Sequence, residues 1–220
     1  MTESQEQLLA DARNYVTEIY TRQVKPELVF HTLEHTEDVV EACSYMADFY
    51  NLSDEDRLIL LLAAWFHDTG YSSGEAAGHE ERSITSATEF LTAQDVEEDV
   101  VQKVSATIRA TKMPQSPVSL IEKILCDADL FHLSTEDFKA RNQLLKQERE
   151  SMLGHKINKK EWRKNNIQFL GNHRYFTDYG QELLEPKKQS NLALFTKKKT
   201  DKKEIVTAEP EKVFPYLTEI

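Results

Sequence analysis

The chain has 220 residues, of which 40% are hydrophobic and 30% are charged, and its formal net charge is −11 at pH 7. This length fits one large domain or a domain with an appendage, and the hydrophobic fraction is sufficient for a core. The negative charge argues against a general binder of nucleic acid duplexes, because a phosphate backbone requires a basic surface.

Apolar residues recur at three- and four-residue spacing in the first third of the chain, which predicts helices over 5–22, 27–50 and 53–66. The second helix is expected to open at Pro26, because proline favours the first turn of a helix. The third starts with a Ser-x-x-Asp sequence that resembles a capping box, and it is apolar almost all round. We therefore expect it at the centre of the fold. Gly70 suits the left-handed position that follows a helix end.

The rest of the chain also has a helical pattern. Helices are predicted over 78–91, 96–111 and 118–130. Ser134 with Asp137 three residues later marks the start of a polar helix that ends near Gly154, and a helical pair is predicted within 158–195. No strand-like alternation occurs, so the expected fold is all-α. We expect a main domain over 1–155, a packed helical appendage over 156–196 and a mobile tail over 197–220, where the composition becomes rich in lysine.

Cysteine content and hydropathy bear on the location of the protein. Only Cys43 and Cys126 are present, both in apolar segments, and the N-terminal residues do not resemble a secretory signal. Reduced thiols and a cytoplasmic location are therefore expected. No run approaches the roughly 18 apolar residues that a bilayer-spanning helix needs, so we expect no membrane span within these residues.

A His-Asp pair, His67 and Asp68, ends the most apolar run of the chain. Adjacent residues in a helix diverge by about 100°, so both side chains can reach one ion only where a helix ends. Thr69-Gly70 supplies such a turn. The alternative is that Asp68 only caps the following loop. Burying the pair after Ala-Ala-Trp-Phe would be costly without a partner, and this favours a bound metal.

An upstream histidine and a downstream aspartate complete a four-ligand set. His31 and His35 lie four residues apart, which places them on one face of a helix, but the His-Glu-x-x-His sequence of metalloproteases is absent. Asp127 and Asp129 lie about 200° apart on a helix, so only one of them faces the site, and periodicity does not decide which. Imidazole nitrogen with carboxylate oxygen suits a divalent transition metal that activates water.

A His, a His-Asp dipeptide and a distal Asp in this order resemble the HD superfamily of metal-dependent phosphohydrolases. The segments 30–36, 63–71 and 126–130 carry the resemblance, which spans roughly residues 30–133. It implies a bundle of helices of the HD type that holds a divalent cation. In the Asp-Ala-Asp block of the family the second aspartate is the ligand, which selects Asp129.

The implied metal ligands are His35, His67, Asp68 and Asp129. Manganese, iron, cobalt, zinc and magnesium are all candidates, since this ligand mix does not select among them. Some members of the superfamily hold a second metal through two extra histidines. His79 falls at the first of these positions, whereas 107–112 contains no histidine, so His79 is a second-metal ligand, a proton donor or a surface residue.

These residues also suggest catalytic roles. A carboxylate can bind an ion with one oxygen and a water with the other, so we expect Asp68 or Asp129 to orient the attacking water. His31 resembles the histidine that acts as general acid in cyclic-nucleotide phosphodiesterases of this superfamily, and Glu80 is the second candidate proton donor. Candidate phosphate-binding cations are Arg82, Arg109 and Lys112.

The leading functional hypothesis is a metal-dependent phosphohydrolase or phosphodiesterase that cleaves a phosphate ester of a nucleotide or related small metabolite. The alternative is a nucleotide-binding sensor or effector module that hydrolyses weakly or not at all. The incomplete second-metal set motivates it, as does a resemblance to Pycsar-type effectors, which act in cyclic-nucleotide antiphage signalling. Hydrolysis of guanosine tetraphosphate is not expected, because no acidic pair follows the His-Asp dipeptide. A homodimer is left open.

Overall fold

A computed structural model of the chain describes residues 1–22 and 25–196. Within these residues the structure is helical and has no strand, which confirms the predicted all-α fold. The predicted tail over 197–220 lies outside the described residues.

Most predicted helices lie within a few residues of the observed ones. The α-helices are α1 (Glu3–Arg22), α2 (Leu33–Phe49), α3 (Asp54–Phe66), α4 (His79–Ala93), α5 (Glu98–Ala110), α6 (Leu120–Asp129), α7 (Phe138–Leu153), α8 (Lys159–Asn172) and α9 (Glu185–Thr196). Two short 3-10 helices, η1 (Thr69–Ser73) and η2 (Phe131–Ser134), follow α3 and α6, and a π-helical turn, η3 (Gly180–Leu184), leads into α9.

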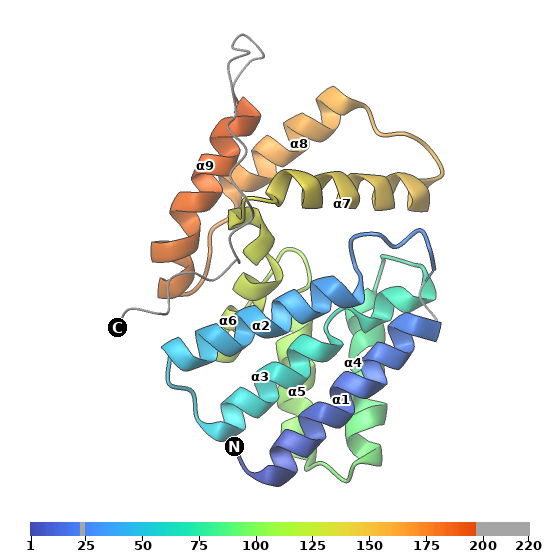
Figure 1. The fold of residues 1–220 in the computed structure, drawn as a ribbon, viewed down its shortest axis with the longest axis vertical. Coiled ribbons are helices and arrows are strands. Elements are labelled where there is room, and N and C mark those ends of the chain that lie inside the picture. The colour runs from blue at the N-terminus through green and yellow to red at the C-terminus, as the bar shows by residue number, and fades with distance from the viewer. Residues whose placement is uncertain (23–24, 197–220) are drawn as a thin grey trace.

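The third helix lies at the centre of the main bundle, as predicted. α3 packs against α1, α2, α4, α5 and α6 (Figure 1). Every residue from Leu58 to Phe66 is buried, because a helix that is apolar all round has to be covered on all sides. Ser53 caps its N-terminus by accepting the N–H of Asp56. The C-terminal end of α3 therefore delivers the His-Asp pair into the interior.

The second helix begins later than predicted. α2 starts at Leu33 rather than at residue 27, because Thr32 is extended (φ −116°, ψ 171°) and its hydroxyl accepts the N–H of His35. Pro26 lies in a segment of turns ahead of the helix. The prediction that His31 shares a helical face with His35 is therefore wrong, since His31 precedes the helix.

Ser134 does not begin a helix either. It ends η2, where its hydroxyl lies 2.6 Å from the hydroxyl of Tyr175 and donates to the carbonyl of Leu184 at 2.9 Å. α7 starts at Phe138, with Asp137 at its N-cap position but no capping hydrogen bond from that side chain. A serine that binds a distant segment is unavailable as a local cap.

Gly70 allows two segments to pack closely, and it does not have the predicted left-handed conformation. The glycines with positive φ in the described chain are Gly74, Gly78 and Gly154. A Cβ atom at Gly70 would lie 2.0 Å from the carbonyl oxygen of His79. The N–H of Gly70 also donates to Ser83 Oγ at 2.9 Å. Glycine at this position thus allows η1 to lie directly against the start of α4.

The last three helices gather at one end of the molecule, beyond α2 (Figure 1). A second apolar cluster lies here, formed by Leu133 of η2, Phe138 and Leu170 with partly buried neighbours at the end of α6 and on α8 and α9. Phe138 belongs to α7, so this helix packs with α8 and α9. The predicted division of the chain at residue 155 stays a prediction.

A buried carboxylate joins this end to the main bundle. Asp127 of α6 accepts the N–H groups of Phe176 and Thr177 at 2.8 and 2.9 Å, and the Thr177 hydroxyl at 2.6 Å. A Cβ atom at Gly180 would lie 2.5 Å from Asp127 Oδ2, so glycine lets the chain pass closely here. Asp127 therefore fixes the connection between α8 and α9 on α6.

In the part of the chain that the structure describes, none of the helices has both the length and the apolar content needed to cross a membrane. Cys43 and Cys126 are buried free thiols, and burial raises the pKa of both.

Candidate metal centre

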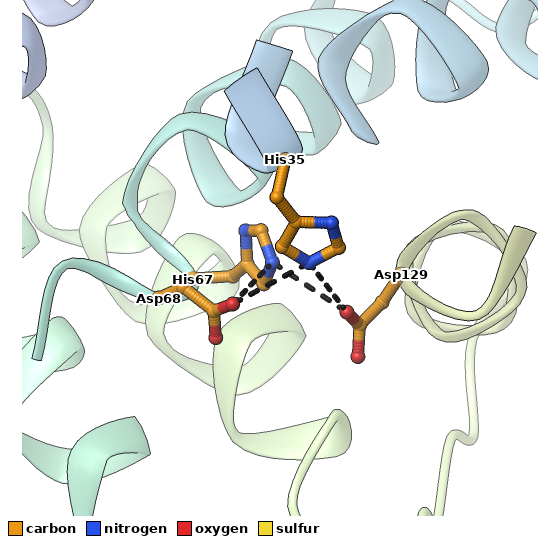
Figure 2. A group of neighbouring side chains, drawn as sticks. All are labelled: His35, His67, Asp68 and Asp129. Atoms are coloured by element: carbon orange, nitrogen blue, oxygen red, sulfur yellow. Dashed lines mark ion pairs between the residues drawn. The ribbon is translucent and has the colours of Figure 1, made fainter. Parts of the chain in front are cut away.

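Four side chains from three separate parts of the chain point toward one another (Figure 2). His35 lies in the first turn of α2, His67 follows the last residue of α3, Asp68 comes next, and Asp129 ends α6. One ligand-type atom from each residue lies within 4.8 Å of the others. The two histidines and Asp68 are buried, and Asp129 is partly exposed, so the cluster faces solvent on the Asp129 side.

The distances within the cluster suit a single divalent ion. The Nε2 atom of His35 lies 3.5 Å from Asp68 Oδ2 and 3.3 Å from Asp129 Oδ1. The Nε2 atom of His67 lies 3.3 Å and 3.7 Å from the same two oxygens. Ligand bonds of about 2.1 Å place neighbouring donor atoms about 3 to 3.4 Å apart around an ion. Small adjustments therefore suffice for all four atoms to share one.

Three of these atoms have no hydrogen-bond partner among the described residues, namely the Nε2 atoms of His35 and His67 and Oδ2 of Asp68. Buried polar atoms without partners are rare and call for an explanation. In His67, Nδ1 lies 2.7 Å from the carbonyl oxygen of Ala64. A carbonyl only accepts, so Nδ1 carries the proton, and Nε2 of the neutral ring directs a lone pair toward the carboxylates. A cation between them satisfies both sets of lone pairs.

The electrostatics of the cluster point in the same direction. Burial lowers the pKa of His67, but the adjacent carboxylates of Asp68 and Asp129 outweigh burial and raise it well above its ordinary value. Burial raises the pKa of Asp68 and Asp129, whereas the imidazoles outweigh this and lower both pKa values below the usual range. The carboxylates thus stay ionised and stabilise positive charge at the imidazole tips, whether it comes from protons or from a metal.

His79 lies beside this cluster, at the first residue of α4. Its Nε2 is 3.5 Å from Asp68 Oδ1, the carboxylate oxygen that the four-atom set does not use. Its Nδ1 is 2.9 Å from the carbonyl oxygen of Ala76, which assigns the proton of the neutral ring to Nδ1 and leaves a lone pair on Nε2. The predicted second-metal ligand therefore faces Asp68 with a nitrogen that can coordinate.

A stack of three rings lies alongside. The ring of Tyr71 in η1 lies between two imidazoles, with centroids 3.9 Å from His31 at an interplanar angle of 11° and 4.1 Å from His79 at 31°. The stack brings the predicted proton donor to the same side of the site as His79.

His31 is held by a carboxylate that sequence reasoning missed. Nδ1 of His31 makes a short contact with Glu148 Oε1. Glu148 Oε2 accepts the backbone N–H groups of Phe30 and His31 at 2.8 and 3.1 Å. Burial raises the pKa of Glu148, but these donors outweigh burial and lower it below its ordinary value.

The other predicted proton donor, Glu80, is buried in the first turn of α4. Its Oε2 lies 3.6 Å from Nδ1 of His79, on the side of that ring away from Asp68. Glu80 thus lies beside His79 and is not one of the four converging residues.

Two of the three predicted phosphate-binding cations are engaged elsewhere. The guanidinium group of Arg82 donates to the backbone carbonyls of Gly70, Glu75 and Ala77, which braces the loop between η1 and α4. Arg109 forms a two-point ion pair with Glu81 at 3.0 and 3.1 Å. Lys112 is exposed just after α5. Their role in phosphate binding stays a prediction.

His132 is another residue near the site that sequence reasoning missed. Its ring centroid lies 5.2 Å from that of Phe30 and 6.3 Å from that of His35. Burial and the charge of His35 lower its pKa to about 4. The available signal was its place in the sequence just after the Asp-Ala-Asp block. In the structure its Nδ1 lies 3.2 Å from the carbonyl oxygen of Asp129.

Comparison with known proteins gives one family match. Residues 32–134 match the family model described as HD domain, and the match contains all four converging residues. The search of the curated proteins gave no match.

Three solved structures resemble the chain. One is a predicted HD superfamily hydrolase from an uncultured Thermotogales bacterium, with 20% identity over 84% of this chain and 87% of that chain and a TM-score of 0.58. A protein from Listeria innocua shows 15% identity over 90% and 97% of the two chains, with a TM-score of 0.61. A protein from Lactobacillus plantarum shows 18% identity over 88% and 90%, with a TM-score of 0.54. At these identities the likeness concerns the fold.

Proposed function

Because residues 32–134 place the chain in the HD domain family, we propose that the protein is a metal-dependent phosphohydrolase acting on a phosphate ester of a nucleotide or related small metabolite. The observation that carries this proposal is the buried set of two imidazoles and two carboxylates with partnerless ligand atoms. A bound divalent cation would lower the pKa of a coordinated water and neutralise phosphate charge. His35, His67, Asp68 and Asp129 are the residues that would hold it.

The side chains around this set supply the other roles. Asp68 orients the attacking water, since it is the carboxylate with one oxygen in the ligand set and the other beside His79. His31 donates the proton that the leaving oxygen requires, and Glu80 is the second candidate for that step. His79 is the candidate ligand for a second ion, shared with Asp68.

Phosphate binding is proposed to involve Arg82, Arg109 and Lys112. Of these, Lys112 is exposed, and Arg109 would first have to release Glu81. An exposed ion pair contributes at most about 1 kcal/mol, so a phosphate group can compete for Arg109. Arg82 has the least freedom, because three backbone carbonyls accept from it.

The test is a screen of nucleoside monophosphates, cyclic nucleotides and small phosphate esters against protein loaded with each candidate metal, with products separated by chromatography. His67→Ala should lower turnover of any substrate by more than about 100-fold, since even residues that only support metal ligands are worth 10- to 100-fold. His155→Ala is the matched control, because His155 is an exposed histidine in the connection between α7 and α8. Equal turnover by both variants would rule out the proposal.

One feature favours a second candidate function, a nucleotide-binding sensor or effector with little hydrolysis. His79 is the only histidine of the second-metal pattern, and 107–112 offers none. Calorimetric binding of a cyclic nucleotide without any product in the chromatogram would favour this candidate. A cytoplasmic location and a homodimer stay predictions.

A further inference from the structure

We propose that Glu148 is a positioning residue that fixes the proton arrangement and the ring plane of His31, so that Nε2 is the nitrogen that donates to the leaving group. This inference rests on the proposed function for its chemistry, but the structural part concerns only this pair. Glu148 lies on α7, outside the residues that match the family model.

The environment of Glu148 allows only one arrangement. The residue is 1% exposed, and a buried carboxylate is costly unless it is paired and hydrogen-bonded. Oε2 accepts two backbone N–H groups, so Oε1 is the oxygen that faces His31 Nδ1. An ionised carboxylate only accepts, which makes Nδ1 the donor. A second proton on His31 must therefore lie on Nε2.

The faces of the His31 ring are fixed as well. Tyr71 stacks on one face at 3.9 Å, and the edge contact with Phe30 has a centroid distance of 4.9 Å at 78°. Glu148 holds the ring within its plane through Nδ1, and Tyr71 holds it against rotation out of that plane. Such restraint from packing and hydrogen bonds is what a catalytic side chain needs to stay in its productive geometry.

Water adds to phosphorus, the bond between phosphorus and the leaving oxygen breaks, and this oxygen keeps the electron pair. The Nε2 proton of His31 passes to that oxygen, and the ring becomes the neutral form with its remaining proton on Nδ1, still donated to Glu148. One proton of the attacking water returns to Nε2 and restores the starting state.

Leaving-group dependence separates this role from a merely structural one. The probes are the p-nitrophenyl ester and the phenyl ester of thymidine 5′-phosphate, which share the phosphoryl group. p-Nitrophenolate departs without a proton, whereas phenolate needs one far more. General acid catalysis contributes about 10²- to 10⁴-fold, so Glu148→Gln should lower kcat for the phenyl ester by about 100-fold or more and change kcat for the p-nitrophenyl ester less than about threefold.

Glu150→Gln is the matched control. Glu150 is 9% exposed, lies on the same helix and accepts the N–H of Ile157, but it does not contact His31. Hydrolysis of both esters should be unchanged in this variant. If Glu148→Gln lowers both esters equally, Glu148 is only structural and the proposal fails.

A second readout does not depend on turnover. Long-range nitrogen–proton NMR spectra of metal-free protein labelled at histidine report which ring nitrogen of His31 carries the proton. The wild type should show Nδ1 protonated, and Glu148→Gln should remove this preference. A wild-type ring protonated on Nε2 alone would overturn the proposal. If the wild type hydrolyses neither ester but shows the Nδ1 proton, the proposed function fails and the positioning by Glu148 stands.

Discussion

At the scale of single residues, the candidate ligands share a position at helix ends. His35 lies in the first turn of α2, and the three others follow or end α3 and α6. In the middle of a helix, His67 and Asp68 would point about 100° apart. Where α3 ends, the backbone turns, and both side chains reach the same point. A metal centre built from helix ends therefore depends on the segments that follow each helix.

Gly70 offers a direct test of that dependence. Gly70→Ala would place a methyl group 2.0 Å from the carbonyl oxygen of His79, which is backbone and cannot rotate away. We expect a loss of about 1 to 3 kcal/mol in the free energy of unfolding, as for other overpacking substitutions. Displacement of His79 from Asp68 should lower activity as well. Urea denaturation measures the stability change.

Gly171→Ala is the control for this substitution. Gly171 lies in α8, and nothing lies within 4 Å of the Cβ that alanine would add. Alanine inside a helix is favoured over glycine by up to about 1 kcal/mol, so this variant should be as stable as the wild type or more stable. Equal destabilisation by the two substitutions would show that the close approach at Gly70 does not matter.

Sequence reasoning was strongest where local pattern determines the outcome. The order of His35, His67-Asp68 and a distal aspartate pointed to the residues that converge. Periodicity could not choose between Asp127 and Asp129, because both flank the same apolar stripe. The structure places Asp129 in the cluster and gives Asp127 three hydrogen bonds from residues 176–177. Those donors lie far along the chain, so no local signal revealed them.

Glu148 was missed for a related reason. It lies on a polar helix, where a charged residue is usually solvated, and its partner His31 is 117 residues away. Periodicity and motif spacing in a single sequence do not reveal such pairs. Buried polar contacts between distant segments are therefore the part of a site that periodicity and motif spacing do not predict.

At the scale of elements, helix bounds were predicted well where two local signals agreed. α3 has an uninterrupted apolar run with a capping serine, and its predicted bounds agree with the structure. α2 was predicted to start too early because the prediction relied on Pro26 alone. In the structure the helix starts after Thr32, whose extended backbone and hydrogen bond to the His35 N–H form the cap.

The attachment of α9 leads to a prediction on pH. Lys188 is fully buried, and its Nζ contacts the carbonyl oxygen and Nδ1 of His173 and Glu185 Oε2. Burial and the charge of Lys188 lower the pKa of His173 from 6.5 to about 4. Between these pH values the unfolded chain binds a proton at His173 that the folded chain does not. The free energy of unfolding should therefore fall as pH drops from 6.5 to 4.

His173→Gln should reduce this dependence, because glutamine does not titrate. Thermal melts of the wild type and the variant at pH 7 and pH 4.5 measure the difference. The wild type should lose more stability than the variant over this interval, and His155→Ala, which alters an exposed histidine, should behave as the wild type does. Identical losses in the wild type and His173→Gln would show that His173 does not couple α9 to pH.

At the scale of the whole molecule, the candidate site joins two parts of the chain. The four converging residues lie within the matched residues 32–134, whereas Glu148 comes from α7, which packs with α8 and α9. On α6, Asp129 belongs to the four-residue cluster, and Asp127 binds residues 176–177 in the connection between α8 and α9. The sequence predicted a helical bundle with an appendage, but it did not predict that a helix following the matched residues completes the surroundings of His31.

Metal binding should therefore stabilise the fold as a whole. A ligand present at 100 times its Kd stabilises a protein by about 2.7 kcal/mol. For a chain of this size, each kcal/mol raises Tm by about 2 to 4 °C, so saturating Mn²⁺ should raise Tm of chelator-treated protein by about 5 to 10 °C. Because the carboxylates raise the pKa of His67, the ion has to displace a proton there, and the shift should be larger at pH 8 than at pH 5.5.

Asp129→Asn distinguishes this stabilisation from nonspecific binding of cations to an acidic protein. Asparagine keeps the shape of the side chain at the end of α6 but removes the carboxylate charge from the ligand set. The shift in Tm with Mn²⁺ should disappear in this variant and persist in His155→Ala, while the net charge of the chain changes by only one unit from −11. A shift of equal size in Asp129→Asn would mean that the metal binds elsewhere on the acidic surface.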